Sequence, residues 1–183
     1  MSLQLINVGT VPNDATGDFP RDAGIKINAN FTELYAQAWT VVVLASDFTT
    51  SSASAVDVTN LFFTPLANLR YEFEAKLMVR TATTTVGPRP GIAWPTGLSD
   101  GAASVWVSSS ATVRVLANGS PAASILAPVG GLPTTTGSWP ARIDGMLIAG
   151  STPSGNLRIQ LASETAATNV TIRAGSFLKY RVI

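Results

Sequence analysis

The pattern of apolar and polar positions divides the chain into one short helix and a long series of strands. Residues 18–38 carry the only strong helix signal, with apolar side chains three and four residues apart. Asp18 is placed to cap this helix, and Pro20 falls in its first turn, where a missing N–H costs nothing. The apolar stripe is narrow and the helix is short, so it needs a packing partner to be stable in water.

Two partners for this stripe are open from the pattern alone. The helix packs either on the β domain of its own chain or on the helices of other copies, in a small parallel bundle. Asn30 lies at the edge of the stripe, and a single Asn in a helix seam can set register and strand number. The bundle hypothesis assigns anchoring and trimerisation to Ile27, Asn30, Phe31, Leu34 and Ala38.

From Trp39 onward the periodicity is that of strands. The clearest strand spans residues 70–81, and its apolar face is predicted to point into the core. That face consists of Tyr71, Phe73, Ala75, Leu77 and Val79. Residues 41–45 are apolar without interruption, which is typical of a strand buried on both faces. The further predicted strands span residues 56–63, 103–107, 111–116, 142–149, 156–162, 169–174 and 176–182.

Proline and glycine interrupt two stretches, residues 83–100 and 127–140, which are predicted as long loops. The first is expected to bury Trp94, and Asn118 with Gly119 predicts a turn. Some eight or nine strands at this spacing predict a mainly β fold. We expect an N-terminal arm and short helix in residues 1–38, then an antiparallel, jelly-roll-like β-sandwich in residues 39–183, forming a trimer.

Composition narrows the function classes. The 183 residues contain no His and no Cys, which removes the commonest general base and excludes disulfides and thiolate metal sites. A net charge of +1 gives no electrostatic case for a nucleic-acid partner. No apolar run is long enough to predict membrane insertion, and the first residues lack signal-peptide features, which predicts retention in the cytoplasm until assembly.

Only 13% of the residues are charged, about half the usual share. A surface of small hydroxyl residues suits close contact between subunits, although a β protein with a Ser/Thr-rich surface has the same composition. Four basic residues late in the chain would line either a subunit interface or a polar face. These are Arg158, Arg173, Lys179 and Arg181.

Two groups of acidic residues are candidates for chemistry. Glu72 and Glu74 share one strand face at a Cα separation of roughly 6–7 Å, which is near the spacing of glycosidase carboxylates. Basic residues on the same face favour a solvated charge ladder instead, so no catalytic residue is predicted and the protein is not expected to be an enzyme. Turn and cap positions account for Asp14, Asp18 and Asp22, so neither a metal nor a cofactor is predicted.

One segment of the sequence has a recognisable form. Residues 8–18 fit a loop of the type Gly-Thr-x-x-Asn-Asp-x-x-Gly-Asp, and residues 26–35 fit a helix of the type Lys-(Ile/Val)-Asn-x-Asn-Phe-x-Glu-Leu-Tyr. Together they resemble the N-terminal segment of tailed-bacteriophage fibre, spike and related virion proteins. Phe19 and Pro20 depart from that form, where polar or Thr-Leu pairs are usual. The resemblance implies attachment to the particle through residues 1–38, at either the tail or the head.

The remainder of the chain looks like a compact β domain of phage structural proteins. The similar stretches are residues 94–98, 128–140, 160–165 and 174–181. In such proteins this domain is an outward-facing trimeric knob. The resemblance therefore implies a homotrimeric virion protein of the fibre or spike type, whose partners are its own copies and other tail, baseplate or capsid proteins.

Three alternatives follow from the same residues. The first is a capsid decoration or head-fibre protein. The second is a carbohydrate-binding module that would contribute to host attachment by binding a host surface glycan. Its glycan contacts would be Trp94, Trp106 and Trp139, since aromatic faces in loops can stack on sugars. The third is a depolymerase, which would want a longer chain and an acidic cleft.

Overall fold

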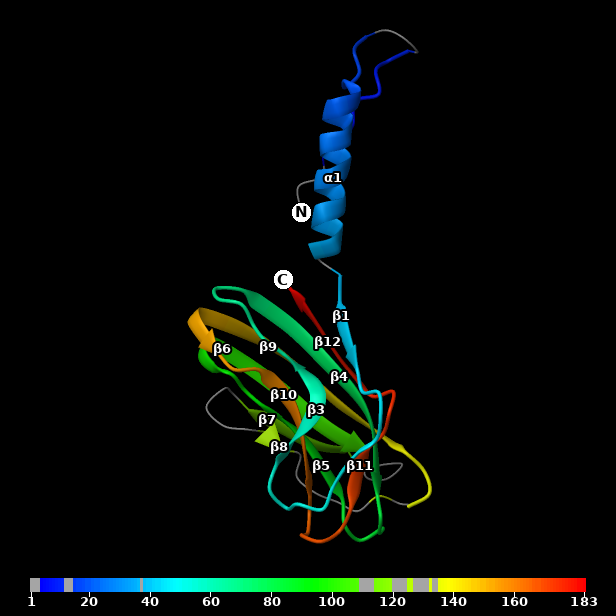
Figure 1. Cartoon of the computed structure of the whole chain (residues 1–183), viewed down its shortest axis with the longest axis vertical. Coiled ribbons are helices and arrows are strands. Elements are labelled where there is room, and N and C mark those ends of the chain that lie inside the picture. The colour runs from blue at the N-terminus through cyan, green and yellow to red at the C-terminus, as the bar shows by residue number, and fades with distance from the viewer. Residues whose placement is uncertain are drawn as a thin grey trace. The chain divides into compact units, whose positions relative to one another are not determined.

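The computed structural model describes residues 4–11, 15–36, 38–108, 114–119, 125–126, 132 and 135–183. The chain divides into two compact units, Met1–Ala38 and Trp39–Ile183 (Figure 1). The first unit holds a helix and the second holds every strand. No helix in the described part of the chain is long and apolar enough to cross a membrane.

The N-terminal unit consists of an extended arm, a loop and the helix α1 (Pro20–Ala36). The amide of Ala23 donates to the carbonyl of Phe19 at 2.9 Å, so Phe19 occupies the cap position and Pro20 the first helical position. The prediction for Pro20 is confirmed, whereas the prediction of Asp18 as cap is wrong by one residue. The helix ends at Ala36, so Ala38, which was predicted to continue the stripe, lies outside the helix.

The C-terminal unit consists of two antiparallel sheets. The larger sheet has the order β1-β12-β4-β9-β6-β7, and β11 joins β2 to β4. The smaller sheet has the order β3-β10-β5-β8. The strands are β1 (Thr40–Val43), β2 (Phe48–Thr50), β3 (Val56–Phe63), β4 (Arg70–Thr81), β5 (Pro88–Ala93), β6 (Thr96–Ser108), β7 (Arg114–Gly119), β8 (Ile125–Leu126), β9 (Trp139–Ser154), β10 (Leu157–Ser163), β11 (Val170–Ile172) and β12 (Phe177–Val182).

A common hydrophobic core joins the two sheets. Phe63 of β3 stacks on Tyr180 of β12 at a centroid distance of 4.2 Å and lies 5.4 Å from Tyr71 of β4. The apolar face predicted for residues 70–81 is buried at every predicted position, including Phe73 at 1% exposure. The predicted mainly β fold of antiparallel sheets preceded by one helix is confirmed.

The prediction that residues 41–45 are buried on both faces is wrong. Val41 and Val43 are 53% and 55% exposed, and only Leu44, just after the strand, is buried. In the described structure β1 pairs with β12 alone, so it is an edge strand. An uninterrupted apolar run does not distinguish a central strand from an edge strand, because the pattern contains no information on neighbours.

The prediction of a loop over residues 83–100 is also wrong, because β5 and the start of β6 occupy it. Two prolines, Pro88 and Pro90, lie inside β5 and pair with β10, while β8 pairs only with the following Gly91 and Ile92. Proline is tolerated in a strand where its missing N–H is not required by a second neighbour. The structure thus places the prolines on the stretch of β5 whose described pairing is one-sided.

Two further predictions fail at the ends of strands. Asn118 and Gly119 lie within β7, opposite Ser104 and Ala103 of β6, and do not form the predicted turn. The strand predicted for residues 111–116 is observed as β7, and its first three residues lie outside the described part. Residues 127–131 and 133–134 of the predicted loop 127–140 also lie outside the described part, and its last two residues begin β9.

Candidate functional site

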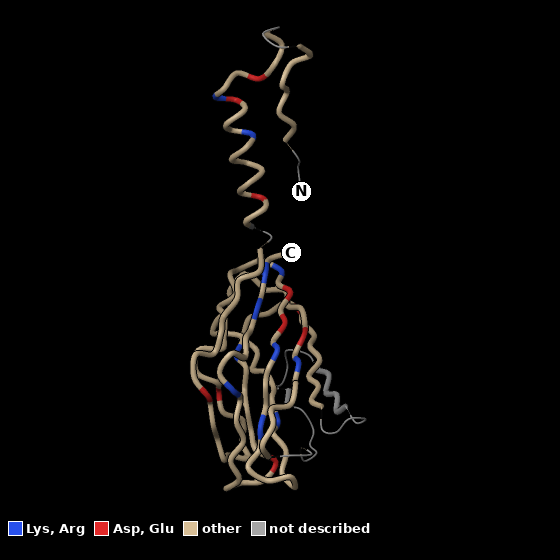
Figure 2. The backbone as a smooth tube through the Cα atoms, turned by 90° about the vertical axis from the view of Figure 1, so that its right-hand side faces the viewer, with Lys and Arg blue, Asp and Glu red and all other residues tan. Residues whose placement is uncertain are grey.

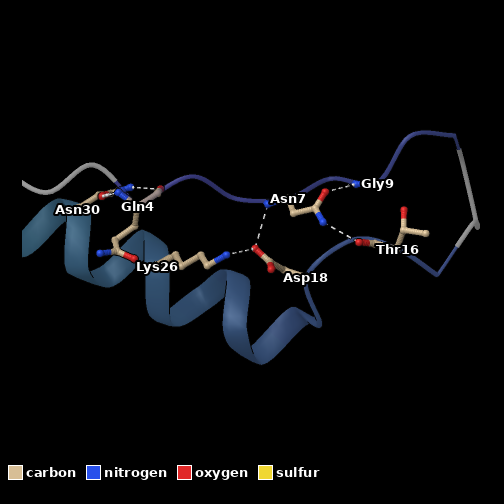
Figure 3. A network of polar contacts seen from close by, with 7 residues as sticks. All are labelled: Gln4, Asn7, Gly9, Thr16, Asp18, Lys26 and Asn30. Carbon is tan, nitrogen blue, oxygen red and sulfur yellow. Dashed lines mark hydrogen bonds and ion pairs between the residues drawn. The ribbon is translucent and has the colours of Figure 1, made fainter.

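The N-terminal unit is a hairpin in which the arm runs back along α1 (Figure 3). At one end, the amide of Gln4 donates to Asn30 Oδ1 at 2.9 Å, and Asn30 Nδ2 donates to the carbonyl of Gln4 at 3.0 Å. At the other end, the amide of Asp18 donates to the carbonyl of Asn7 at 2.7 Å. The side-chain amide of Asn30 is therefore bonded to the arm. These bonds use the same Oδ1 and Nδ2 groups that would form hydrogen bonds in a helix seam.

Asn7 closes the loop between the arm and the helix. Its Nδ2 donates to the carbonyl of Thr16 at 2.6 Å, and its Oδ1 accepts from the amide of Gly9 at 3.0 Å. Its backbone amide donates to Asp18 Oδ2 at 2.9 Å. The sequence prediction did not include Asn7, although an Asn side chain commonly bonds the backbone two residues further on and so stabilises a turn.

Backbone geometry explains why glycine occupies two positions of this loop. Gly9 adopts a φ of 80°, a left-handed conformation that favours glycine. A Cβ on Gly17 would lie 3.0 Å from the carbonyl oxygen of Asn7 and 3.2 Å from the amide nitrogen of Gly9. A side chain at Gly17 would therefore crowd the backbone where the two ends of the loop approach each other.

Asp18 connects the arm to the helix through charge. Lys26 Nζ lies 2.6 Å from Asp18 Oδ2, which also accepts the amide of Asn7. The hydrogen bond from Lys26 lowers the pKa of Asp18 below its usual value, and the amide of Asn7 lowers it further. The carboxylate is occupied by these donors, and no group of three metal-binding side chains is present among the described residues. Of the other candidate ligands, Asp14 lies outside the described part.

The predicted apolar stripe is exposed. Ile27, Phe31 and Leu34 are 40%, 52% and 63% exposed, and the ring of Phe31 stacks on that of Tyr35 at 6.4 Å. At helical spacing these residues share one side of α1, next to the side on which Lys26 and Asn30 hold the arm. The arm therefore leaves the stripe open. A small residue, Gly24, lies on the same side, where an added Cβ would meet no atom within 4 Å.

The structure does not bring the three predicted glycan-contacting tryptophans together. Trp94 packs edge-on against Phe73 of the core, at 5.9 Å and 79°. Trp139 also packs against the core, opposite the buried Val79. Trp106 alternates with the buried Val105 and Val107 and is therefore on the outer face of the larger sheet. Trp106 and Trp139 both line a groove of about 450 Å³, and Trp94 is not among its lining residues.

The two glutamates of β4 belong to a ladder of ion pairs. Arg181 Nη2 lies 2.6 Å from Glu72, and Lys179 Nζ lies 2.7 Å from Glu74. Although burial alone would raise it, the pKa of Glu74 is lowered by the hydrogen bond from Lys179 and by the charges of Arg142 and Lys76. Positions of acidic and basic residues alternate along the backbone in this part of Figure 2. The arrangement fits the predicted charge ladder.

A known protein family matches the part of the chain that contains this hairpin. Residues 3–65 match the family described as "Bacteriophage T4 gp9/10-like protein, N-terminal", a match that covers the arm and α1 and extends through β3. Over 32 residues the chain is 62% identical to baseplate wedge protein gp10 of Enterobacteria phage T4. The resemblance to virion proteins of tailed bacteriophages is confirmed. The match spans 18% of this chain and only 5% of gp10.

Two solved structures are distantly similar to the chain. They are those of the infectious bursal disease virus Gx and Gt strains, at 14% and 13% identity, with TM-scores of 0.22 and 0.23. Each match covers 80% of this chain and 37% or 38% of the viral chain. TM-scores this low support no conclusion on shared fold or function.

Proposed function

We propose that the chain is a structural protein of a tailed-bacteriophage virion, of the fibre or spike type, which its N-terminal unit anchors to the particle. The observation that carries the proposal is the hairpin of arm and helix, because it lies within residues 3–65, which match the gp9/10-like N-terminal family. The similarity of 32 residues to a baseplate wedge protein supports a docking role among other phage structural proteins.

The hairpin has the properties of a preformed docking element. Its polar groups are used internally, between Asn7, Thr16 and Asp18 at one end and between Gln4 and Asn30 at the other. Its apolar side chains are left exposed on both arm and helix. The most exposed on the arm are Leu5 at 74% and Val8 at 86%. Burial of such side chains against a partner would stabilise a complex, at about 25 cal/mol per Å² of apolar surface.

We further propose that three copies associate through the stripe of Ile27, Phe31 and Leu34, with a jelly-roll-like knob formed by residues 39–183. A helix of 17 residues is marginal by itself in water, and a parallel bundle would bury its open apolar side. The same proposal assigns a mechanical rather than a catalytic role to the protein.

Removal of residues 1–38 tests the anchoring role. Particles should be assembled with the shortened chain and with the full chain, and each preparation should be probed with antibody after purification. We expect the full chain in the particle and the shortened chain in the unassembled fraction. Equal incorporation of both chains would contradict the anchoring proposal.

A second candidate, a head decoration or head-fibre protein, uses the same docking segment. The shared segment with a baseplate protein favours the tail over the head. Antibody labelling in negative-stain micrographs separates the two, since label at the tail supports the first proposal and label spread over the capsid supports the second.

A further inference from the structure

We propose that a polar pocket between β2, β4 and β11 binds an acidic saccharide unit, with its carboxylate between the guanidinium groups of Arg80 and Arg173. The pocket has a volume of about 270 Å³ and lies wholly within the C-terminal unit. Neither guanidinium belongs to the charge ladder of Glu72 and Glu74, nor to the groove that Trp106 lines.

Each of the two arginines is held in place through its own Nε. Arg80 Nε donates to the carbonyl of Thr135 at 2.8 Å, and Arg173 Nε lies 2.9 Å from Asp47 Oδ2. These bonds orient the two guanidinium planes through Nε, and among the described residues the terminal Nη donors remain for a ligand. Arginine forks match the planar geometry of a carboxylate, with which they form paired hydrogen bonds.

Asp47 supports the site without neutralising it. Its Oδ1 accepts the amide of Ala174 at 2.8 Å, in addition to its contacts with Arg173. The hydrogen bond from Ala174 contributes most to lowering the pKa of Asp47, so the group is a carboxylate at neutral pH. Two guanidinium groups against one carboxylate leave an excess of one positive charge, which favours an anionic ligand.

Neutral polar groups next to the arginines provide the contacts that a sugar ring requires. Thr171 lies directly opposite Arg80 in the β11–β4 pair and opposite Thr49 in the β11–β2 pair. The hydroxyls of Thr49 and Thr171 lie 2.9 Å apart and are exposed, so each retains capacity for a further hydrogen bond. Asn169 also lines the pocket. Small numbers of such groups fix the orientation of a ligand in a concave site.

The proposal is independent of the anchoring function, because the pocket would bind its ligand in protein that never joins a particle. Calorimetric titration of the full chain should use D-glucuronate and an oligouronate as probes, D-glucose as the neutral sugar and inorganic phosphate as the free anion. We expect binding of the uronates, weaker or no binding of phosphate, and none of glucose.

Matched variants test the two arginines. Arg80→Gln and Arg173→Gln should each weaken uronate binding at least tenfold, whereas Arg158→Gln, which removes the same charge from β10, should leave it unchanged. Arg80→Lys keeps the charge but loses the fork, so it should also weaken binding, and it replaces Arg173→Gln if that variant does not fold. Absence of uronate binding, preference for phosphate, or equal loss in Arg158→Gln would overturn the proposal.

Discussion

At the scale of single residues, Asn7 makes the hydrogen bonds that close the loop of the N-terminal unit, whereas the apolar side chains of the arm are exposed. Its backbone and its side chain bond to three places in the loop, at Gly9, Thr16 and Asp18. All of these bonds are in exposed surroundings, where each contributes about 0.5–1.5 kcal/mol net. The closed loop therefore depends on one Asn rather than on burial.

Asn7→Ala tests this dependence. It removes both side-chain bonds of Asn7, so the arm should open more often and the amide of Asp18 should exchange with solvent about tenfold faster. Hydrogen–deuterium exchange read by NMR measures this rate. Asn28→Ala, at an exposed helix position, serves as the control and should leave the exchange rate of Asp18 unchanged. An unchanged rate in the Asn7 variant would mean that the backbone bonds alone close the loop.

The ion pair between Asp18 and Lys26 makes arm closure sensitive to acid. Because folding lowers the pKa of Asp18, its contribution is complete above the unfolded value near 3.8 and is lost as the pH falls through the lower folded-state value. Limited proteolysis between pH 7 and pH 3, with an acid-active protease, should therefore show cleavage of the arm only at the acidic end. Asp18→Asn should remove that pH dependence, and a dependence that persisted would have to come from another carboxylate.

At the scale of elements, α1 presents two different sides. One side holds the arm through Lys26 and Asn30, and the neighbouring side carries the open stripe. Sequence periodicity places Ile27, Phe31 and Leu34 on one side of α1, because apolar spacing of three and four is a local property. It could not find the arm's place on the helix, because the pairing of Gln4 with Asn30 joins residues 26 positions apart.

Leu34→Asp tests whether the stripe joins copies of the chain. A charge on the proposed seam would have to be buried in the bundle, so the variant should scatter light as a single chain of 19.0 kDa. The unaltered protein should have about three times that mass. Ile25→Asp is the matched control, since Ile25 is 58% exposed on the opposite side of α1 and should keep the larger mass. A monomeric unaltered protein at micromolar concentration would exclude the trimer.

The centre of the larger sheet depends on one glycine of β9. A Cβ on Gly145 would lie 2.5 Å from the carbonyl oxygen of Ala102 and 2.6 Å from Cζ of Phe73, its partner on β4. Gly145→Ala should therefore destabilise the β unit by about 1–3 kcal/mol through overpacking. Thermal unfolding measures the change. Met146→Ala, at the adjacent and half-exposed position, should cost less than about 0.5 kcal/mol, and equal costs would refute the steric explanation.

At the scale of the whole molecule, the hydrophobic core lies entirely in the C-terminal unit. Its buried residues extend from Leu44 to Leu178 and come from both sheets. A chain shortened to residues 39–183 should therefore unfold cooperatively, with a melting temperature within a few degrees of that of the full protein. Circular dichroism measures both. A molten or aggregated short chain would show that the N-terminal unit is needed for folding, and loss of incorporation would then not be evidence for anchoring.

The sequence by itself determined the features that repeat locally. The alternation over residues 70–81 predicted both faces of β4, and the motif in residues 8–35 predicted the relation to phage virion proteins. Periodicity and sequence motifs depend on residues close together in the chain, so they can be recognised without knowing the partner strand. Only part of the charge ladder could be predicted for the same reason. Glu72 and Glu74 share β4, whereas Lys179 and Arg181 come from β12, which the sequence pattern does not place beside β4.

Only the tertiary structure decided which segments became neighbours. It made β1 an edge strand, placed two prolines inside β5, and turned Trp94 and Trp139 towards the core. It also brought Arg80 and Arg173 to one pocket and Gln4 to Asn30. These outcomes depend on pairings between distant residues, and the free energy of such contacts is settled by the packing of the whole unit rather than by local preference.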